Sequence, residues 1–396
     1  MASQETLPHV EPARAAFLND PKVRSIIVQV VVVALLVFGV WFIVANTMEN
    51  LRRANIASGF DFMSSRAGFD ISISLIGYDL NDTFGKALIV GFINTIVIAI
   101  TGIVTATIIG FLVGVGRLSR NWLISRICTV YVEVFRNIPP LLVIFFWYLG
   151  VLSVLPAPRN SIEMPFSTYL NSRGLYMPKA LWGEGAWLIG VALILAIAMS
   201  IFVARRARAR QMATGQTFPV LWTSLGLILG LPLLAYVVTG FPLSFEVPTQ
   251  STFNLTGGLT VKPEFIALYL ALSFYTAAFI AEIVRAGIKG VPHGQTEASS
   301  ALGLRPRQLL RLVVVPQAMR IVIPPLTSQY LNLTKNSSLA VAVGYPDLVA
   351  IGGTILNQTG QAIEIVLIWM LVYLSLSIAT SLFMNWFNAK MALVER

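Results

Sequence analysis

Long apolar runs without charged side chains constrain this chain more than any other feature of its sequence. The first of them, residues 26–45, holds twenty residues and no Asp, Glu, Lys or Arg. An α-helix rises about 1.5 Å per residue, so about twenty residues cross the roughly 30 Å hydrocarbon core of a bilayer. Only 12% of the 396 residues are charged, against about 25% in soluble domains. The chain is therefore expected to be a membrane protein built from helical spans.

Eight long, predominantly apolar runs, some of which contain a few charged side chains, are predicted to be transmembrane helices. The segments between them are rich in residues typical of turns and of loops outside the bilayer. The predicted spans are residues 26–45, 87–116, 127–154, 186–204, 218–239, 263–288, 320–343 and 363–387. The expected fold is an all-α integral membrane protein with about eight transmembrane helices.

The distribution of basic side chains indicates the orientation of these spans. Of the 28 Lys and Arg residues, 18 fall on the side of the two termini and 8 on the opposite side. Cytoplasmic loops carry the excess of Lys and Arg, so both termini are expected in the cytoplasm. Residues 1–21 are expected to be a cytoplasmic tail rather than a signal peptide. The arginine run at residues 205–210 lies between two spans, so we interpret it as an orientation signal and expect no nucleic-acid partner.

Few side chains are available for metal, nucleotide or catalytic chemistry. The chain contains one cysteine, Cys128, and two histidines, His9 and His293. It has neither the GxxxxGK[ST] loop of nucleotide-binding proteins nor the HExxH pair of zinc enzymes. We therefore expect no metal, no cofactor and no enzymatic activity in this chain.

Residues 297–316 form a polar segment between two predicted spans. Residues 297–302 favour a helix, and Gly303 can then adopt the left-handed conformation that ends a helix without a Cβ penalty. Pro306 suits a first helical position, so a second helix is expected to run to Pro316. The prediction is a helix–glycine–helix bend in a cytoplasmic loop. Its small residues would let another protein approach closely, and its arginines would stay solvated.

This segment resembles the EAA loop of importer-type ABC transporter permeases. That pattern is Glu-Ala-Ala, three residues, Gly, nine residues and Ile-x-Leu-Pro. The residues at its specified positions are Glu297, Ala298, Ser299, Gly303, Val313, Val315 and Pro316, of which the two valines and the serine depart mildly from the pattern. Residues 131–142, 290–299 and 333–348 resemble the polar amino-acid branch of the family. In length the chain is most similar to the long permease subunits of general L-amino-acid importers.

The resemblance implies a division of the chain and a surface for an ATPase. Residues 1–86 would hold the tail, the first span and an external loop. Residues 87–390 would be the ABC transporter transmembrane domain, a core of five spans with an inserted hairpin at about residues 186–239. The residues that the resemblance assigns to ATPase coupling are Glu297, Ala298, Ser299, Gly303, Leu304, Arg305 and Pro316.

The resemblance also implies a function and a set of partners. The chain would be the permease subunit of an ATP-driven importer that moves polar or broad-range L-amino acids across the bacterial inner membrane. Its partners would be an ABC ATPase dimer, a second permease subunit, different or identical, a periplasmic amino-acid-binding protein and membrane lipid. ATP and Mg²⁺ would be used by the ATPase. The alternative is a secondary transporter driven by an ion gradient, but such proteins usually contain inverted repeats and no internal repeat is evident here.

A polar stretch in the seventh predicted span is the candidate substrate pathway. A charged side chain in the bilayer costs at least about 2.5–3.5 kcal/mol, so Lys335 needs a partner or a wet cavity. A free amino acid carries an ammonium and a carboxylate, and its passage needs both hydrogen-bond acceptors and donors. The candidate residues are Asn94, Thr95, Gln329, Asn332, Lys335, Asn336 and Ser337. Alternatively, the stripe is a polar seam between two permease subunits, and Asn94 and Thr95 bridge helices.

Two acid–arginine pairs lie within the predicted spans. Glu133 and Arg136 stand three residues apart with the acid first, and so do Glu282 and Arg285. Side chains at this spacing are neighbours on a helix and can form an ion pair. We expect a structural pair at each position, with a pathway role for Glu133 and Arg136 as the alternative.

Overall fold

The structure, a computed structural model, describes residues 21–53, 59–251 and 254–391. Most of the expected N-terminal tail, including His9, lies outside the described residues. In the described part, seven helical segments are long and apolar enough to cross a membrane, and a bent pair is an eighth candidate. The seven are α1 (Pro21–Arg53), α2 (Phe84–Gly116), α5 (Trp187–Thr214), α6 (Val220–Val238), α7 (Pro263–Lys289), the segment Pro306–Val343 and α12 (Ala362–Met391). The prediction of a helical membrane protein with about eight spans is confirmed.

The eighth candidate span is broken in its middle. α3 (Trp122–Asn137) is followed by α4 (Pro140–Phe145) and a π-helical turn, η3 (Phe146–Leu152), and the two halves are bent by 112°. Ile138 and Pro139 between them have extended backbone, with ψ angles of 134° and 140°. A residue that precedes proline avoids the α conformation, and both of these residues precede a proline. The predicted span 127–154 is therefore two segments and not one helix.

The core is built on the close packing of α2 against α7. Ile280 and Ala281 on α7 are fully buried. A Cβ at Gly110 would lie 2.5 Å from Cγ2 of Ile280, and a Cβ at Gly114 would lie 2.7 Å from the carbonyl oxygen of Ala281. Small residues four apart let two membrane helices approach closely. The two glycines therefore set the distance between these helices, around which α10 (Val315–Asn336), α11 (Leu348–Thr359) and α12 also pack.

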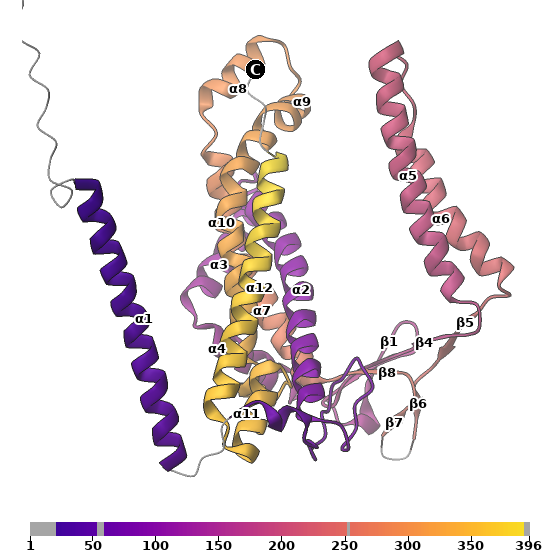
Figure 1. The fold of residues 1–396 in the computed structure, drawn as a ribbon. Coiled ribbons are helices and arrows are strands. Elements are labelled where there is room, and N and C mark those ends of the chain that lie inside the picture. Colours follow the sequence, from indigo (N-terminus) through magenta and orange to yellow (C-terminus); the bar gives the residue numbers. More distant parts are fainter. Residues whose placement is uncertain (1–20, 54–58, 252–253, 392–396) are drawn as a thin grey trace, which may run out of the picture.

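The core helices run between two ends that differ in structure (Figure 1). At one end, the bend end, α8 (His293–Ala301) and α9 (Pro306–Leu309) project beyond the long helices. At the opposite end, the sheet end, lie α11 and the described strands. The expected coupling segment and the expected external loops therefore lie at opposite ends of the core.

Two predicted external loops pair into short antiparallel sheets. Four strands form a sheet in the order β1-β2-β3-β8, and β4-β5 and β6-β7 are separate pairs. Their bounds are β1 (Ile162–Met164), β2 (Thr168–Asn171), β3 (Gly174–Met177), β4 (Lys179–Trp182), β5 (Leu243–Glu246), β6 (Thr249–Gln250), β7 (Leu255–Thr256) and β8 (Leu259–Val261). Leu175 of β3 lies opposite Val261 of β8, which ties the segment before α5 to the segment before α7. The sequence analysis did not predict these strands, although the fold is helical in the main, as expected.

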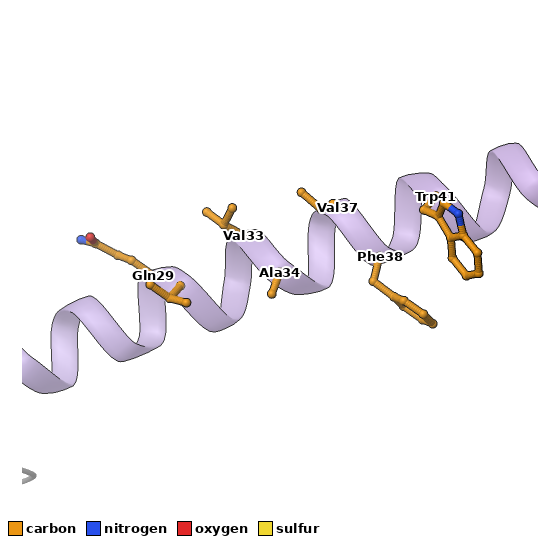
Figure 2. A pocket seen from close by; sticks show the side chains of 7 residues that line it. Gln29, Val33, Ala34, Val37, Phe38 and Trp41 are labelled. Atoms are coloured by element: carbon orange, nitrogen blue, oxygen red, sulfur yellow. The ribbon is translucent and has the colours of Figure 1, made fainter.

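α1, α5 and α6 lie outside the core in Figure 1. α5 and α6 pack on each other, and α1 stands alone with exposed apolar side chains. A groove on α1 is lined by residues of this helix only, and Figure 2 shows the labelled side chains projecting from its ribbon. An apolar surface of this extent is typical of contact with a membrane or another protein. The groove is therefore part of a helix surface rather than a site enclosed by several elements.

Candidate functional site

Gly303 ends α8 in the left-handed conformation, with a φ angle of 74°. The Gly303 N–H donates to the carbonyl of Ser300 at 2.9 Å, and the Leu304 N–H donates to the carbonyl of Ser299 at 3.2 Å. These two bonds form the Schellman motif of helix C-termini. A Cβ at Gly303 would have no atom within 4 Å, so the backbone conformation alone favours glycine. The predicted left-handed residue at the bend is confirmed.

The chain after the bend runs into the membrane-spanning helix without interruption. Arg305 has extended backbone, Pro306 takes a first-turn position as predicted, and the side-chain oxygen of Gln308 accepts from the Arg305 N–H at 3.1 Å. α9 continues through a π-helical turn, η5 (Leu310–Val314), into α10. The expected end of this helix at Pro316 is wrong. Pro316 lies in the first turn of α10, where its missing N–H is tolerated, and the π turn provides the connection.

Glu297 lies one turn inside α8 rather than at its start. Pro292 is the N-cap of this helix and His293 its first residue. The carboxylate of Glu297 lies 2.9 Å from Nδ1 of His293, and both side chains are exposed. The helix dipole acts mainly within the first turn, so it stabilises the carboxylate of Glu297 little. Ala298 beside it is also exposed, whereas Ser299 is buried.

Leu302 at the tip of the bend was not selected from the sequence. Its side chain is 82% exposed, and Arg305, three residues further along the chain, is also exposed. Beneath this surface, the side-chain amide of Gln317 on α10 donates to the side-chain oxygen of Gln295 on α8 at 3.1 Å. The bend thus exposes the apolar side chain of Leu302 and the cationic side chain of Arg305, and α8 below it is hydrogen-bonded to α10. The available signal was a pair of leucines, Leu302 and Leu304, on either side of the glycine at the bend.

Three of the predicted pathway residues line one pocket. Gln329, Asn332 and Asn336 lie on one face of α10, because residues spaced by three and four share a helix face. They enclose a pocket of about 260 Å³ with residues of α4 and α7. The other lining residues are Pro140, Tyr275, Thr276 and Phe279. We call this site the amide pocket, since its three α10 residues offer neutral donors and acceptors.

Lys335 and Ser337 do not line the amide pocket. Lys335 is exposed on a neighbouring face of α10. Ser337 is fully buried, and its hydroxyl donates to the carbonyl of Thr334 at 2.7 Å. The predicted stripe is therefore divided among three environments.

Asn94 and Thr95 bind the backbone between η6 (Ser337–Val343) and α11. Both are fully buried on α2. The Asn94 Nδ2 group donates to the carbonyls of Ile73 at 2.8 Å and Pro346 at 2.9 Å. The Thr95 hydroxyl accepts from the Leu348 N–H at 3.1 Å. This geometry matches the helix-bridging alternative, but it leaves Oδ1 of Asn94 without a partner among the described residues.

Asp347 is a buried acid that the sequence analysis did not single out. Its Oδ1 accepts from the Ala350 N–H at 2.8 Å, which caps the start of α11. The Tyr373 hydroxyl donates to its Oδ2 at 3.4 Å. Burial raises the pKa of the Asp347 carboxyl to about 7. The available signal was an aspartate directly before an apolar helical run, the position of a typical N-cap.

A cluster of five charged side chains joins α2, α3 and α7. Glu282 forms ion pairs with Arg117 and Arg285, and it lies 3.9 Å from Arg136. Arg117, at the end of α2, also lies 3.7 Å from Glu133. The predicted pair of Glu282 and Arg285 is confirmed. The predicted pair of Glu133 and Arg136 is wrong, because the nearly buried Arg117 lies between α3 and α7 and each partner reaches another helix.

Known proteins are similar to this chain along nearly its whole length. Residues 209–393 match the family described as "Binding-protein-dependent transport system inner membrane component". The chain is 67% identical over 379 residues to the General L-amino acid transport system permease protein AapQ of Rhizobium johnstonii, covering 96% of this chain and 95% of that protein. It is 48% identical over 381 residues to the Putative amino-acid ABC transporter permease protein YhdX of Escherichia coli, covering 95% and 96%.

Two further proteins are similar over much of the chain. The Glutamate/glutamine/aspartate/asparagine transport system permease protein BztB of Rhodobacter capsulatus is 41% identical over 423 aligned positions, covering 98% of this chain and 99% of that protein. A crystal structure of an amino acid ABC transporter with histidines is 18% identical, with a TM-score of 0.46, covering 78% of this chain and 95% of that chain.

Proposed function

The chain belongs to the binding-protein-dependent permeases of ABC transporters, and we propose that its two candidate sites drive and line the import of amino acids. It is a permease subunit of an ABC importer for amino acids, like the relatives that it matches along nearly its whole length. The ion-gradient alternative finds no support in these relatives.

The observation that carries the coupling proposal is the continuous connection between the bend and the amide pocket. The Schellman bonds fix the bend at the end of α8, and the hydrogen bond between Gln317 and Gln295 joins α8 to the start of α10. From Pro306 the helical chain then runs to Asn332 in the pocket through α9, η5 and α10. A displacement applied at the exposed Leu302 would reach the pocket through backbone hydrogen bonds rather than through a flexible loop. We infer that an ATPase dimer docks on this surface and moves α10.

The proposed assembly follows from the two ends of the core. The ATPase dimer, which binds ATP and Mg²⁺, would contact the bend end in the cytoplasm of a bacterium. A periplasmic amino-acid-binding protein would deliver the substrate at the sheet end. A second permease subunit, of a different sequence in our proposal, would complete the pathway in the inner membrane. Both termini would be cytoplasmic, and this chain would bind no cofactor.

The amide pocket is the proposed substrate contact of this subunit. Gln329, Asn332 and Asn336 each provide a side-chain N–H₂ donor and a carbonyl acceptor. Such groups can pair with both the carboxylate and the ammonium of an amino acid. Among the described residues, no acidic or basic side chain lines the pocket, which favours a broad or polar substrate range over a cationic one.

Reconstitution of the complete complex into lipid vesicles tests this proposal. With Mg-ATP on the side of the ATPase and binding protein on the other, the vesicles should accumulate L-glutamine, used as a polar probe. Uptake should stop when ATP is replaced by a non-hydrolysable analogue. Uptake that continues without ATP and follows an imposed ion gradient would contradict the proposal.

A further inference from the structure

A further pocket lies at the turn between α5 and α6, away from the amide pocket. These two helices form a hairpin beside the core, and their turn lies toward the bend end (Figure 1). The pocket has a volume of about 210 Å³. We call it the hairpin pocket, and its lining residues are Phe202, Val203, Arg206, Ala207, Arg210 and Phe218.

The depth of the hairpin pocket in the bilayer follows from the apolar part of α5. Residues 187–204 contain no charged side chain. At about 1.5 Å per residue they span about 27 Å, close to the roughly 30 Å of the hydrocarbon core. Arg206 and Arg210 lie about 3 Å and 9 Å beyond the end of this run, at the level of the lipid headgroups. Phe202 lies within the run, at the level of the acyl chains.

Two arginines of the pocket carry charges that no acid neutralises. Arg206 and Arg210 are four residues apart, so they share a face of α5. Both are exposed, and neither forms an ion pair among the described residues. The guanidinium of Arg206 lies 5.7 Å from the centroid of the Phe202 ring, and Nη2 of Arg210 donates to Oε1 of Gln216 at 2.8 Å. These neutral partners orient the two side chains and leave their charges available to an anion.

The surroundings of the pocket point to an anion from the bilayer. Residues 185–245 contain no Asp or Glu, and their four arginines all fall within residues 205–210. The hairpin therefore has no acid of its own to offset this charge. Guanidinium groups bind phosphate through paired hydrogen bonds, and basic pockets between membrane helices on the cytoplasmic side bind anionic lipid headgroups.

The remaining lining of the pocket is apolar and accessible. Phe202 on α5 is 60% exposed, and Phe218 on the other side of the turn is 46% exposed. An aromatic wall beside two cations fits a molecule that has both an anionic head and a hydrocarbon chain. A water molecule occupies about 30 Å³ in the liquid, so the pocket has room for a phosphate diester.

We propose that the hairpin pocket binds an anionic phospholipid, with its phosphate between the guanidinium groups of Arg206 and Arg210 and an acyl chain along Phe202. The lipid belongs to the leaflet at the bend end, which is the cytoplasmic leaflet in the proposed orientation. The arginine run then has a binding role in addition to its role as an orientation signal. A free phosphate would meet the same two arginines but would leave the apolar wall uncovered.

Photolabelling of the complete complex in phosphatidylcholine nanodiscs tests the inference. The probe is phosphatidylglycerol with a photoreactive acyl chain, and label is measured in chymotryptic peptides that cover residues 202–218. These peptides should be labelled preferentially over those from α1, and phosphatidylcholine with the same photoreactive chain should show no such preference. Soluble glycerol 3-phosphate should not reduce the labelling. A reduction would indicate a free-phosphate site and would overturn the inference.

Two matched pairs of variants separate a pocket from diffuse attraction to the arginine run. Arg206→Gln with Arg210→Gln should reduce the preference for phosphatidylglycerol by about tenfold or more, because each basic residue at an anionic headgroup contributes about fivefold. Arg205→Gln with Arg208→Gln removes the same charge from side chains that do not line the pocket and should have a much smaller effect. Equal effects of the two double variants would overturn the inference.

A substitution that fills the pocket provides a test without a change of charge. Ala207 lines the pocket, whereas Ala209 is exposed and does not line it. Ala207→Trp should therefore abolish the preferential labelling, and Ala209→Trp should retain it. If Ala207→Trp is labelled like the parent, or if the parent complex shows no preference because another subunit covers the hairpin, the pocket is not a lipid site.

Discussion

Replacing Gly303 tests whether the angle of the bend is essential for transport. Its φ angle of 74° costs a residue with a Cβ about 1–2 kcal/mol. A Cβ there would contact no atom within 4 Å, so Gly303→Val bears this backbone cost without a clash against neighbouring atoms. A free-energy change of about 1–2 kcal/mol shifts a conformational ratio by roughly five- to thirtyfold. We therefore expect most molecules of the variant to adopt another backbone conformation at residue 303, in which α8 has a different orientation.

Gly215 offers a matched control for this substitution. It ends α5 with a φ angle of 72°, and a Cβ there would also contact no atom within 4 Å. It lies in the turn between α5 and α6, outside the core. Gly215→Val should therefore have the same backbone cost but leave the bend unchanged. Gly303→Asn should recover part of the lost activity, because asparagine tolerates the left-handed conformation better than valine.

Three measurements in one preparation decide the outcome. They are ATP-driven uptake in vesicles, retention of the ATPase during purification, and ATP hydrolysis stimulated by loaded binding protein. Gly303→Val should insert normally but lose uptake, and either lose the ATPase or lose the stimulation. If Gly303→Val transports at the parent rate with the ATPase attached, or if Gly215→Val is equally impaired, the bend is not the coupling element.

Three further predictions address orientation, pH and the substrate site. A reporter fused after Arg210 should be cytoplasmic and one fused near Thr249 should be external, and reversed signals would contradict the orientation. The pKa of Asp347 is about 7 in the folded state and near 4 in the unfolded state. Between these pH values the folded form holds a proton that the unfolded form releases, so the melting temperature should fall as the pH rises from about 4 to about 7. Asp347→Asn should remove this slope, and an identical slope would exclude Asp347 as its origin. Asn332→Leu should raise the half-saturating concentration for uptake by about tenfold or more, since a hydrogen bond to a charged group contributes about 1.5–3 kcal/mol. Lys335→Met should leave that concentration unchanged, and equal effects of the two variants would refute the assignment of the amide pocket.

The spans and the bend could be predicted because they depend on local sequence. A run such as residues 26–45 identifies a membrane helix by length and polarity alone. Gly303 and Pro306 have backbone preferences that act within a few residues. The break at Pro139 also had a local signal, but its angle of 112° depends on the packing of α3 and α4 against α7. The sequence pattern shows where the helix stops and not where it continues.

The interactions that could not be predicted join residues that are distant in the chain. The spacing of Glu133 and Arg136 suggested a pair, but Arg117 from another helix competes for the acid and Glu282 for the guanidinium. The pairing of β3 with β8 likewise joins segments on either side of the α5–α6 hairpin. Each strand has only three or four residues, too few for its alternation to be distinguished from a loop.

The amide pocket could be predicted only in part for a related reason. The composition of the polar stripe indicated a substrate pathway, but its division into faces depends on the helical phase of α10. Asn332 and Lys335 are neighbours on that helix, yet only Asn332 lines the pocket. The phase is fixed by contacts of α10 with α7 and α12, which the order of residues in the chain does not reveal.

The pairing of Met177 with Leu259 makes the segment between them a module that begins and ends at one point. An antiparallel pair of this kind can be closed by a two-residue turn such as Asn-Gly. Replacing residues 178–258 by that turn would excise α5, α6 and their strands while keeping the register of β3 and β8. The segment that replaces residues 178–258 at this junction could equally be the corresponding segment of another family member. A segment attached in this way can be gained, lost or exchanged during evolution without changes in the packing of the core helices.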